Sequence, residues 1–123
     1  DNWNNRCRSI AKKYIINLKN IVDVPNMKNY EESVYHNFVI KINDRDKLMG
    51  FLSKNGIDTK IHYPIPMHLQ EAAKNLNFKN GDFPNAERFA KTMLSLPIYP
   101  QMSDEQIFYV IAQIKEFYAE KNV

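Results

Sequence analysis

The segment Val34-Tyr35-His36-Asn37-Phe38-Val39-Ile40-Lys41-Ile42 alternates in side-chain character, and this alternation decides the fold class. Successive side chains of a β-strand point to opposite faces, so every second residue shares a face. One face would carry Val34, His36, Phe38, Ile40 and Ile42, and the other would carry Tyr35, Asn37, Val39 and Lys41. The pattern predicts a strand over 34–42 with the first set facing the core.

Helical patterns lie on both sides of this strand. Before it, apolar residues recur at spacings of three and four and predict a helix over 3–19. The members of this stripe are Trp3, Cys7, Ile10, Ala11, Tyr14 and Leu18. After the strand, Asn43 or Asp44 can cap a helix that ends at Asn55-Gly56, where glycine tolerates a left-handed conformation. This second helix would turn Leu48, Phe51 and Leu52 inward.

The rest of the chain continues to alternate between strands and helices. A second strand is expected over 57–61, followed by a helix from Ile65 to Leu76. Pro84 suits the first turn of a helix that would extend to Leu94, and a short strand is expected over 96–99. Ser103 and Gln106 match a capping box before a long apolar stripe, which predicts a final helix.

Strands that alternate with helices predict an α/β domain in which a small sheet is covered mainly on one face by helices. The polar segment 20–33, which contains Pro25, reads as a loop. We therefore expect residues 1–20 to form a helix whose partner surface lies outside this sequence, 21–33 a linker, and 34–123 a folding unit of their own.

Composition limits the possible functions. The chain has 123 residues, 44% hydrophobic and 25% charged, with no apolar run near the roughly 20 residues that span a bilayer. A single cysteine, Cys7, predicts no disulfide and a cytoplasmic setting. The net charge of +3 includes a basic cluster near the N-terminus, but this fits the solvated face of a helix, so no nucleic-acid partner is predicted. The start, without an initiator Met, suggests a piece of a longer protein.

The candidate site is the turn after the second strand, Ile61-His62-Tyr63-Pro64-Ile65-Pro66-Met67-His68. Its prolines restrict the backbone, and its imidazoles can exchange protons near neutral pH. His62, Tyr63 and His68 are candidate ligand contacts, and each also has a structural alternative as a cap, a packed ring or a buried core histidine. His36 shares the inward side of its strand, so it is either packed or part of the site.

Other kinds of chemistry lack a signal in this sequence. A tetrahedral metal needs at least three protein ligands, and the nearby histidines lack a cysteine or carboxylate at a matching spacing, so no metal is predicted. No glycine-rich phosphate loop is present. Ser95 and Ser103 have no evident paired base, and Ser103 is explained as a helix cap. The residues alone thus indicate a domain that contacts a ligand without its own catalytic group.

Several separate segments resemble the C-terminal region of DegT-type sugar aminotransferases. They include Arg6 and Arg8 in the first helix, Tyr35-His36, Arg45-Asp46, and Gly56-Ile57-Asp58-Thr59 leading into the His62 to His68 turn. The series continues with Gly81-Asp82-Phe83-Pro84-Asn85-Ala86-Glu87, Leu94-Ser95-Leu96-Pro97-Ile98-Tyr99-Pro100 and the Ser103 to Gln106 helix start. Their order and spacing match over nearly the whole chain.

The resemblance implies the small domain of a homodimeric pyridoxal-phosphate enzyme. Such an enzyme moves an amino group, typically from glutamate, to a nucleotide-linked keto-sugar. The family's cofactor-binding lysine lies in a large domain upstream, so this chain alone is expected to bind no cofactor and to be inactive. The resemblance places His62, Tyr63 and His68 on the sugar side. It leaves open a dehydratase relative, the identity of the sugar, and a non-catalytic nucleotide-sugar-binding or regulatory module.

Overall fold

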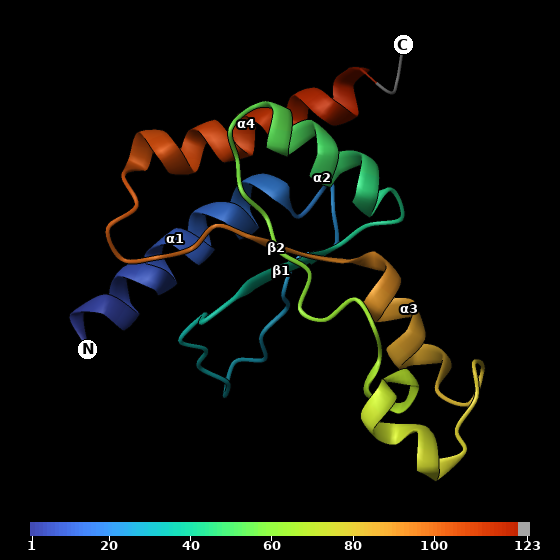
Figure 1. The fold of residues 1–123 in the computed structure, drawn as a ribbon. Coiled ribbons are helices and arrows are strands. Elements are labelled where there is room, and N and C mark those ends of the chain that lie inside the picture. The colour runs from blue at the N-terminus through green and yellow to red at the C-terminus, as the bar shows by residue number, and fades with distance from the viewer. Residues whose placement is uncertain (121–123) are drawn as a thin grey trace.

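The computed structural model describes residues 1–120 of the chain, which fold around a two-stranded sheet (Figure 1). The helices are α1 (Asn2–Leu18), α2 (Arg45–Lys54), α3 (Pro84–Thr92) and α4 (Asp104–Glu120), and the strands are β1 (Phe38–Lys41) and β2 (Met93–Leu96). Two short 3₁₀ helices, η1 (Met67–Leu69) and η2 (Glu71–Leu76), lie between α2 and α3. No helix in this part of the chain is long and apolar enough to cross a membrane.

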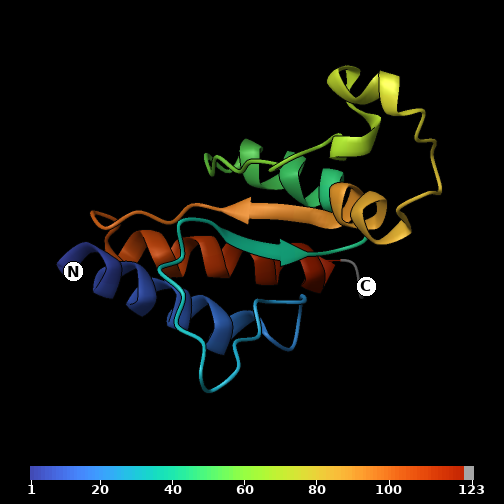
Figure 2. The same ribbon diagram turned by 90° about the horizontal axis from the view of Figure 1, so that it is seen from below.

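The sheet is antiparallel, and its two faces differ sharply. Phe38 pairs with Leu96 and Ile40 pairs with Leu94, and all four side chains are buried. The helices α1, α2 and α4 lie on the side of the sheet that these residues face (Figures 1 and 2). The predicted fold class, an α/β unit with a small sheet covered mainly on one face, is confirmed.

The first helix packs into this same core. Its inner residues Ile10, Ala11, Tyr14 and Leu18 have no exposed surface, whereas Trp3, at the start of the stripe, is 70% exposed. Within the described residues, α1 thus belongs to the core that also holds the sheet and α4. Its assignment as an element that links to another domain stays a prediction about the longer protein.

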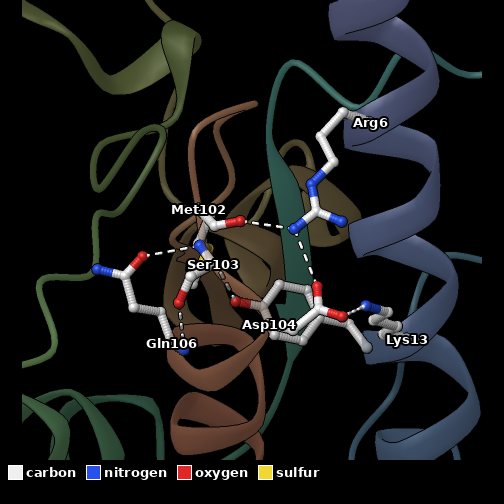
Figure 3. Close-up of polar contacts among 7 residues, drawn as sticks. Arg6, Lys13, Met102, Ser103, Asp104 and Gln106 are labelled. Atoms are coloured by element: carbon white, nitrogen blue, oxygen red, sulfur yellow. Dashed lines mark hydrogen bonds and ion pairs between the residues drawn. The ribbon is translucent and has the colours of Figure 1, made fainter.

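The start of α4 is fixed by the capping box that its sequence predicts. Ser103 Oγ accepts a hydrogen bond from the Gln106 N–H at 3.2 Å, and Gln106 Oε1 accepts one from the Ser103 N–H at 2.9 Å (Figure 3). Arg6 and Lys13 of α1 both reach Asp104 at the same helix end, and Arg6 also donates to the Met102 carbonyl at 2.7 Å. These contacts join the first helix to the last.

The strand predicted over 34–42 begins four residues later, at Phe38. Tyr35 has a φ of 51°, which a continuous strand does not allow. Val34 and His36 are exposed instead of sharing the buried face with Phe38. The expectation that His36 points inward was therefore wrong, because the regular alternation of the strand does not extend to it.

Three other boundaries also differ from the predictions. The expected strand over 57–61 is an extended segment with a single antiparallel bridge, between Lys60 and Ser95. The last strand is 93–96 instead of 96–99, because α3 ends at Thr92 and the chain turns directly into β2. Leu94 consequently packs in the core as part of a strand, not of a helix.

The helix predicted over 65–76 is replaced by η1 and η2, and neither contains a buried residue. We call residues 62–83 the arm, because in both ribbon views this segment projects from the rest of the fold next to α3 (Figures 1 and 2). The apolar stripe on which the helix prediction rested has no core to face: Ile65 is 53% exposed and Leu76 is 59% exposed. The arm is therefore organised by local contacts.

Candidate functional site

A groove of about 310 Å³ lies on the face of the sheet that α1, α2 and α4 leave open. Ser95 of β2 pairs with Val39 of β1, and both point away from the core because their strand neighbours point into it. Ser95 lies at the wall of this groove. The other polar residues that line it are His36, Asn37, Asp58, Lys60, His62 and Tyr99.

His62 is held at the groove by a hydrogen bond to Ser95. Its Nδ1 lies 2.9 Å from Ser95 Oγ. The backbone of Ser95 is itself fixed, since its N–H donates to the Lys60 carbonyl at 2.8 Å and its carbonyl accepts from the Lys60 N–H at 3.2 Å. The prediction that Ser95 has no paired base was wrong, because the extended segment 57–61 lies next to β2 and brings His62 over it.

His36 lines the candidate site, and Tyr63 lies beside it. His36 lies in the irregular segment before β1 and lines the same groove as His62. Tyr63 is 72% exposed, and its ring meets the His62 ring edge to face at a centroid distance of 5.8 Å. The peptide bond between His62 and Tyr63 is cis. The structure thus brings two of the four predicted site residues, His36 and His62, to the groove, and Tyr63 contacts His62 without lining the groove.

His68 lies apart from this groove and contacts α3. Its Nε2 is 3.1 Å from Glu87 Oε1, and its ring packs on Phe83 at 4.8 Å. The same carboxylate oxygen accepts the N–H groups of Gly81 at 2.8 Å and Phe83 at 3.3 Å. The His68 side chain is only 8% exposed. Its surroundings are therefore those of a buried histidine, the alternative to a ligand contact given above.

Glu87 is buried at the base of the arm, and its environment favours the charged form. The Gly81 N–H that bonds to it does most to hold the pKa of Glu87 below its usual range; burial opposes this shift, and the Phe83 N–H and His68 reinforce it. A carboxylate that accepts several hydrogen bonds is stabilised in this way. Glu87 therefore ties the arm to α3 at His68 and at Gly81 and Phe83.

The groove is built for hydrogen bonding and carries little net charge. Lys60 Nζ pairs with Asp58 at 3.0 Å, and both side chains are more than 60% exposed. Hydroxyl, imidazole and amide groups make up the remaining polar wall. Such an array of donors and acceptors matches the hydroxyl groups of a carbohydrate. Among residues 1–120, no three metal-ligating side chains converge.

Sequence patterns could have found part of this groove. In Leu94-Ser95-Leu96 the polar residue stands between two core residues, which places its side chain on the opposite face of a strand. Lys60 and Tyr99 offered no such signal, because they reach the groove through the pairing of distant segments.

A larger hollow, of about 510 Å³, lies near the other end of the sheet. Its two cations are already engaged: Lys41 pairs with Asp23, and Lys41 and Arg88 both lie over the Phe89 ring, at 5.4 and 5.5 Å from its centroid. The acidic groups Asp23 and Asp44 also line it. This arrangement offers no free charge of one sign for a ligand, so we favour the smaller groove.

Three of the basic residues near the N-terminus, Arg6, Arg8 and Lys13, have acidic partners within the chain. Arg6 and Lys13 pair with Asp104, and Arg8 pairs with Glu32 at 3.2 Å. Arg8 also donates to the Ser33 carbonyl at 3.1 Å, which holds the loop before β1 against α1. These contacts thus hold α1 to the start of α4 and to the loop before β1.

Comparison with known proteins identifies relatives of the whole unit. The chain is 35% identical to the dTDP-3-amino-3,4,6-trideoxy-alpha-D-glucose transaminase of Streptomyces venezuelae over 95% of its own length and 31% of the relative's. It is 38% identical to a protein of Geobacillus stearothermophilus named pleiotropic regulatory protein, over 96% of this chain and 33% of that one. The chain thus spans about a third of the length of these relatives.

Solved structures show the same fold. The crystal structure of S. venezuelae DesV in complex with a ketimine intermediate superposes with a TM-score of 0.90 at 35% identity, covering 94% of this chain and 32% of that one. A putative sugar aminotransferase of Streptococcus pneumoniae in its PLP form gives a TM-score of 0.83 at 26% identity, covering 93% and 31%. The DegT/DnrJ/EryC1/StrS aminotransferase family model matches residues 1–115, and the chain therefore belongs to this family.

Proposed function

We propose that this chain is the C-terminal small domain of a PLP-dependent aminotransferase that transfers an amino group, from glutamate, to a nucleotide-linked keto-sugar. The observation that carries this proposal is the match to a dTDP-amino-sugar transaminase over 95% of the chain. The polar groove on the open face of the sheet supports it, because its donors suit a sugar.

In this proposal the groove orients the sugar and the rest of the protein holds the cofactor. His36 and His62 contact sugar oxygens, and Tyr63 adds a ring beside His62. Hydrogen bonds of this kind align a reacting carbon, which lowers the barrier by fixing the geometry before the reaction. His68 contributes indirectly, because its bond to Glu87 holds the arm that begins at the His62 turn.

The described residues do not fit the cofactor itself. Pyridoxal phosphate supplies an electron sink when it is bound to a lysine whose amine is activated by desolvation or by a neighbouring cation. The lysine that lines the groove, Lys60, is largely exposed and paired with Asp58. We therefore assign cofactor binding to the two thirds of the protein beyond this chain, and we expect the 123-residue chain alone to be inactive. The homodimeric state of the full protein belongs to the same proposal.

The test uses the full-length protein and separates its two half-reactions. We expect His62→Ala to slow amino transfer to a dTDP-linked keto-sugar by roughly 10- to 100-fold, a loss typical of a misplaced reacting group. Loading of the cofactor with the amino group of glutamate should change much less. The matched control is Tyr109→Phe, which removes a hydroxyl from the exposed side of α4. Equal losses in both half-reactions would contradict a sugar-side role.

A second function, a nucleotide-sugar-binding or regulatory module, is favoured by the regulatory name of the G. stearothermophilus relative. It predicts that the isolated chain binds dTDP-glucose without catalysing any reaction. Calorimetry at millimolar ligand tests it. If the isolated chain binds none and the full-length protein turns over, this alternative is excluded.

A further inference from the structure

Ser95 occupies a more constrained position than any other polar residue of the groove. It is only 6% exposed, it pairs with Val39 in the sheet, and it makes both backbone hydrogen bonds of the bridge to Lys60. Its backbone is therefore held from both sides. A side chain on such a backbone presents its hydroxyl in a fixed place, and that hydroxyl meets His62.

The hydrogen-bond partners of Ser95 favour one direction for this bond. A serine hydroxyl carries one hydrogen, and a buried hydroxyl hydrogen is donated to some acceptor. Among residues 1–120, the partner of Ser95 Oγ is His62 Nδ1, at 2.9 Å. A neutral imidazole accepts through the nitrogen that carries no hydrogen, so the ring hydrogen then lies on Nε2.

We propose that Ser95 is a positioning residue that fixes both the orientation and the tautomer of His62. In this arrangement Ser95 Oγ donates to Nδ1, and His62 presents an Nε2–H donor to the groove. Within residues 1–120, Nε2 of His62 has no hydrogen-bond partner, so it is available to a ligand. The hydrogen bond at one ring nitrogen thus determines whether the other nitrogen carries the hydrogen and donates.

The arrangement determines which kind of ligand atom can form a hydrogen bond with His62. An N–H donor pairs with an oxygen that offers a lone pair, such as a carbonyl or a sugar hydroxyl acting as acceptor. This part rests on the proposed function, whereas the link between Ser95 and the His62 tautomer stands without it. The two parts can therefore fail separately.

The first experiment measures the tautomer directly. Full-length protein labelled with ¹⁵N-histidine is compared with its Ser95→Ala and Ser95→Thr variants by long-range ¹H–¹⁵N correlation, with the His62 signals assigned from their loss in His62→Gln. We expect a pyridine-type shift at Nδ1 and a pyrrole-type shift at Nε2 in the wild type. Ser95→Ala should move the Nδ1 shift away from its hydrogen-bonded value, and Ser95→Thr, which keeps the hydroxyl, should restore it.

Ser103→Ala serves as the control for stability, because it removes a helix cap on another element. It should leave the His62 signals unchanged. A hydrogen found on Nδ1 in the wild type, or identical His62 shifts in wild type and Ser95→Ala, would overturn the proposal. If Ser95→Ala does not fold, Ser95→Cys, with a similar size and a weaker donor, takes its place with the same criteria.

The second experiment measures the consequence for binding. Calorimetry with dTDP-glucose should show affinity lowered roughly 3- to 10-fold in Ser95→Ala, the worth of one ordinary hydrogen bond, with recovery in Ser95→Thr. If neither His62→Gln nor Ser95→Ala affects binding while the tautomer changes as expected, the sugar-side function of the groove fails and the positioning role of Ser95 remains. If the affinity falls equally in Ser103→Ala, this result contradicts only the proposal that His62 binds the ligand, and the positioning role of Ser95 remains.

Discussion

The body of the molecule, residues 1–61 and 84–120, and the arm, residues 62–83, are stabilised in opposite ways. The body encloses a continuous core in which Phe38, Leu48 and Ile114 have no exposed surface. No residue of the arm is buried as a whole, although the His68 side chain is enclosed. Its large apolar side chains are exposed by more than a third: Tyr63, Ile65, Met67, Leu69, Leu76, Phe78 and Phe83.

This difference shows how the two regions keep their shape. The body depends on apolar burial, which contributes roughly 25 cal/mol per Å² removed from water. The arm depends on specific contacts, which include the Glu87 carboxylate with its three donors and the ring contacts of Phe83 with His68 and Phe78. Substitutions in the body should therefore change global unfolding, and those in the arm should change local opening.

The largest effect is expected from Phe38→Ala. Phe38 is fully buried at the start of β1, with the Tyr14 ring at 5.0 Å, so its removal leaves a cavity that the strand cannot close. We expect the free energy of unfolding to fall by about 3–5 kcal/mol. Urea denaturation of the wild type and the variant measures this, and a loss below about 1 kcal/mol would show that the body is not closely packed.

A smaller effect on the body is expected from Ser103→Ala, which removes half of the capping box of α4. The Gln106 N–H then loses its acceptor, and the expected destabilisation is about 1 kcal/mol. Thermal unfolding provides the measurement. Ser103→Asp, which keeps a side-chain acceptor at the cap, should recover most of the loss, and no recovery would argue that the cap is not the cause.

Glu87→Gln should open the arm while leaving the body nearly intact. The amide oxygen is a weaker acceptor than the carboxylate for Gly81, Phe83 and His68. In hydrogen exchange, the amides of Gly81 and Phe83 should exchange faster, while those of Ile40 and Leu94 in the sheet keep their protection. Uniform acceleration over the whole chain would contradict the separation of arm and body.

The same residue predicts an acid dependence of the arm. The pKa of Glu87 lies below its usual range in the folded state, so its contribution is present above the unfolded pKa of about 4.3 and is lost as pH falls through the lower folded value. Hydrogen exchange of the arm in the wild type should accelerate over that range. In Glu87→Gln this acceleration should be absent, and its persistence would point to another titrating group.

The smallest effect is expected from Met67→Ser in the arm. Met67 is 82% exposed, so its removal should change the free energy of unfolding of this chain by no more than about 0.5 kcal/mol. Chemical denaturation checks this against Phe38→Ala. A loss as large as that of a core substitution would show that the arm side chains are covered.

The body was largely predictable from sequence because its signals are local. The capping box at Ser103 and Gln106, the apolar stripe of α1 and the glycine stop at Gly56 each depend on neighbouring residues, and the structure has all three. The arm was not predictable in the same way. The stripe from Ile65 to Leu76 has helical spacing, but a helix of this length is stabilised mainly by packing, and neither η1 nor η2 contains a buried residue.

The candidate site was predictable only in part, for a related reason. His62 and Tyr63 were evident as a polar turn between prolines. The contact between His62 and Ser95 joins residues 33 positions apart, and no periodic pattern encodes it. His68 shows the same limit: its place on an apparent helical stripe gave no sign of Glu87, 19 positions away, which determines its surroundings.

The contact of Arg6 with Met102 and Asp104 has a consequence for the synthesis of the protein. Met102 and Asp104 follow Arg6 by 96 and 98 positions, so α4 leaves the ribosome long after α1. At a translation rate of about 5–20 residues per second, the apolar face of α1 stays exposed for roughly 5–20 seconds before α4 is synthesised. During that interval we expect chaperones to bind this apolar face, and slow codons between α1 and α4 would lengthen the time for which it is exposed.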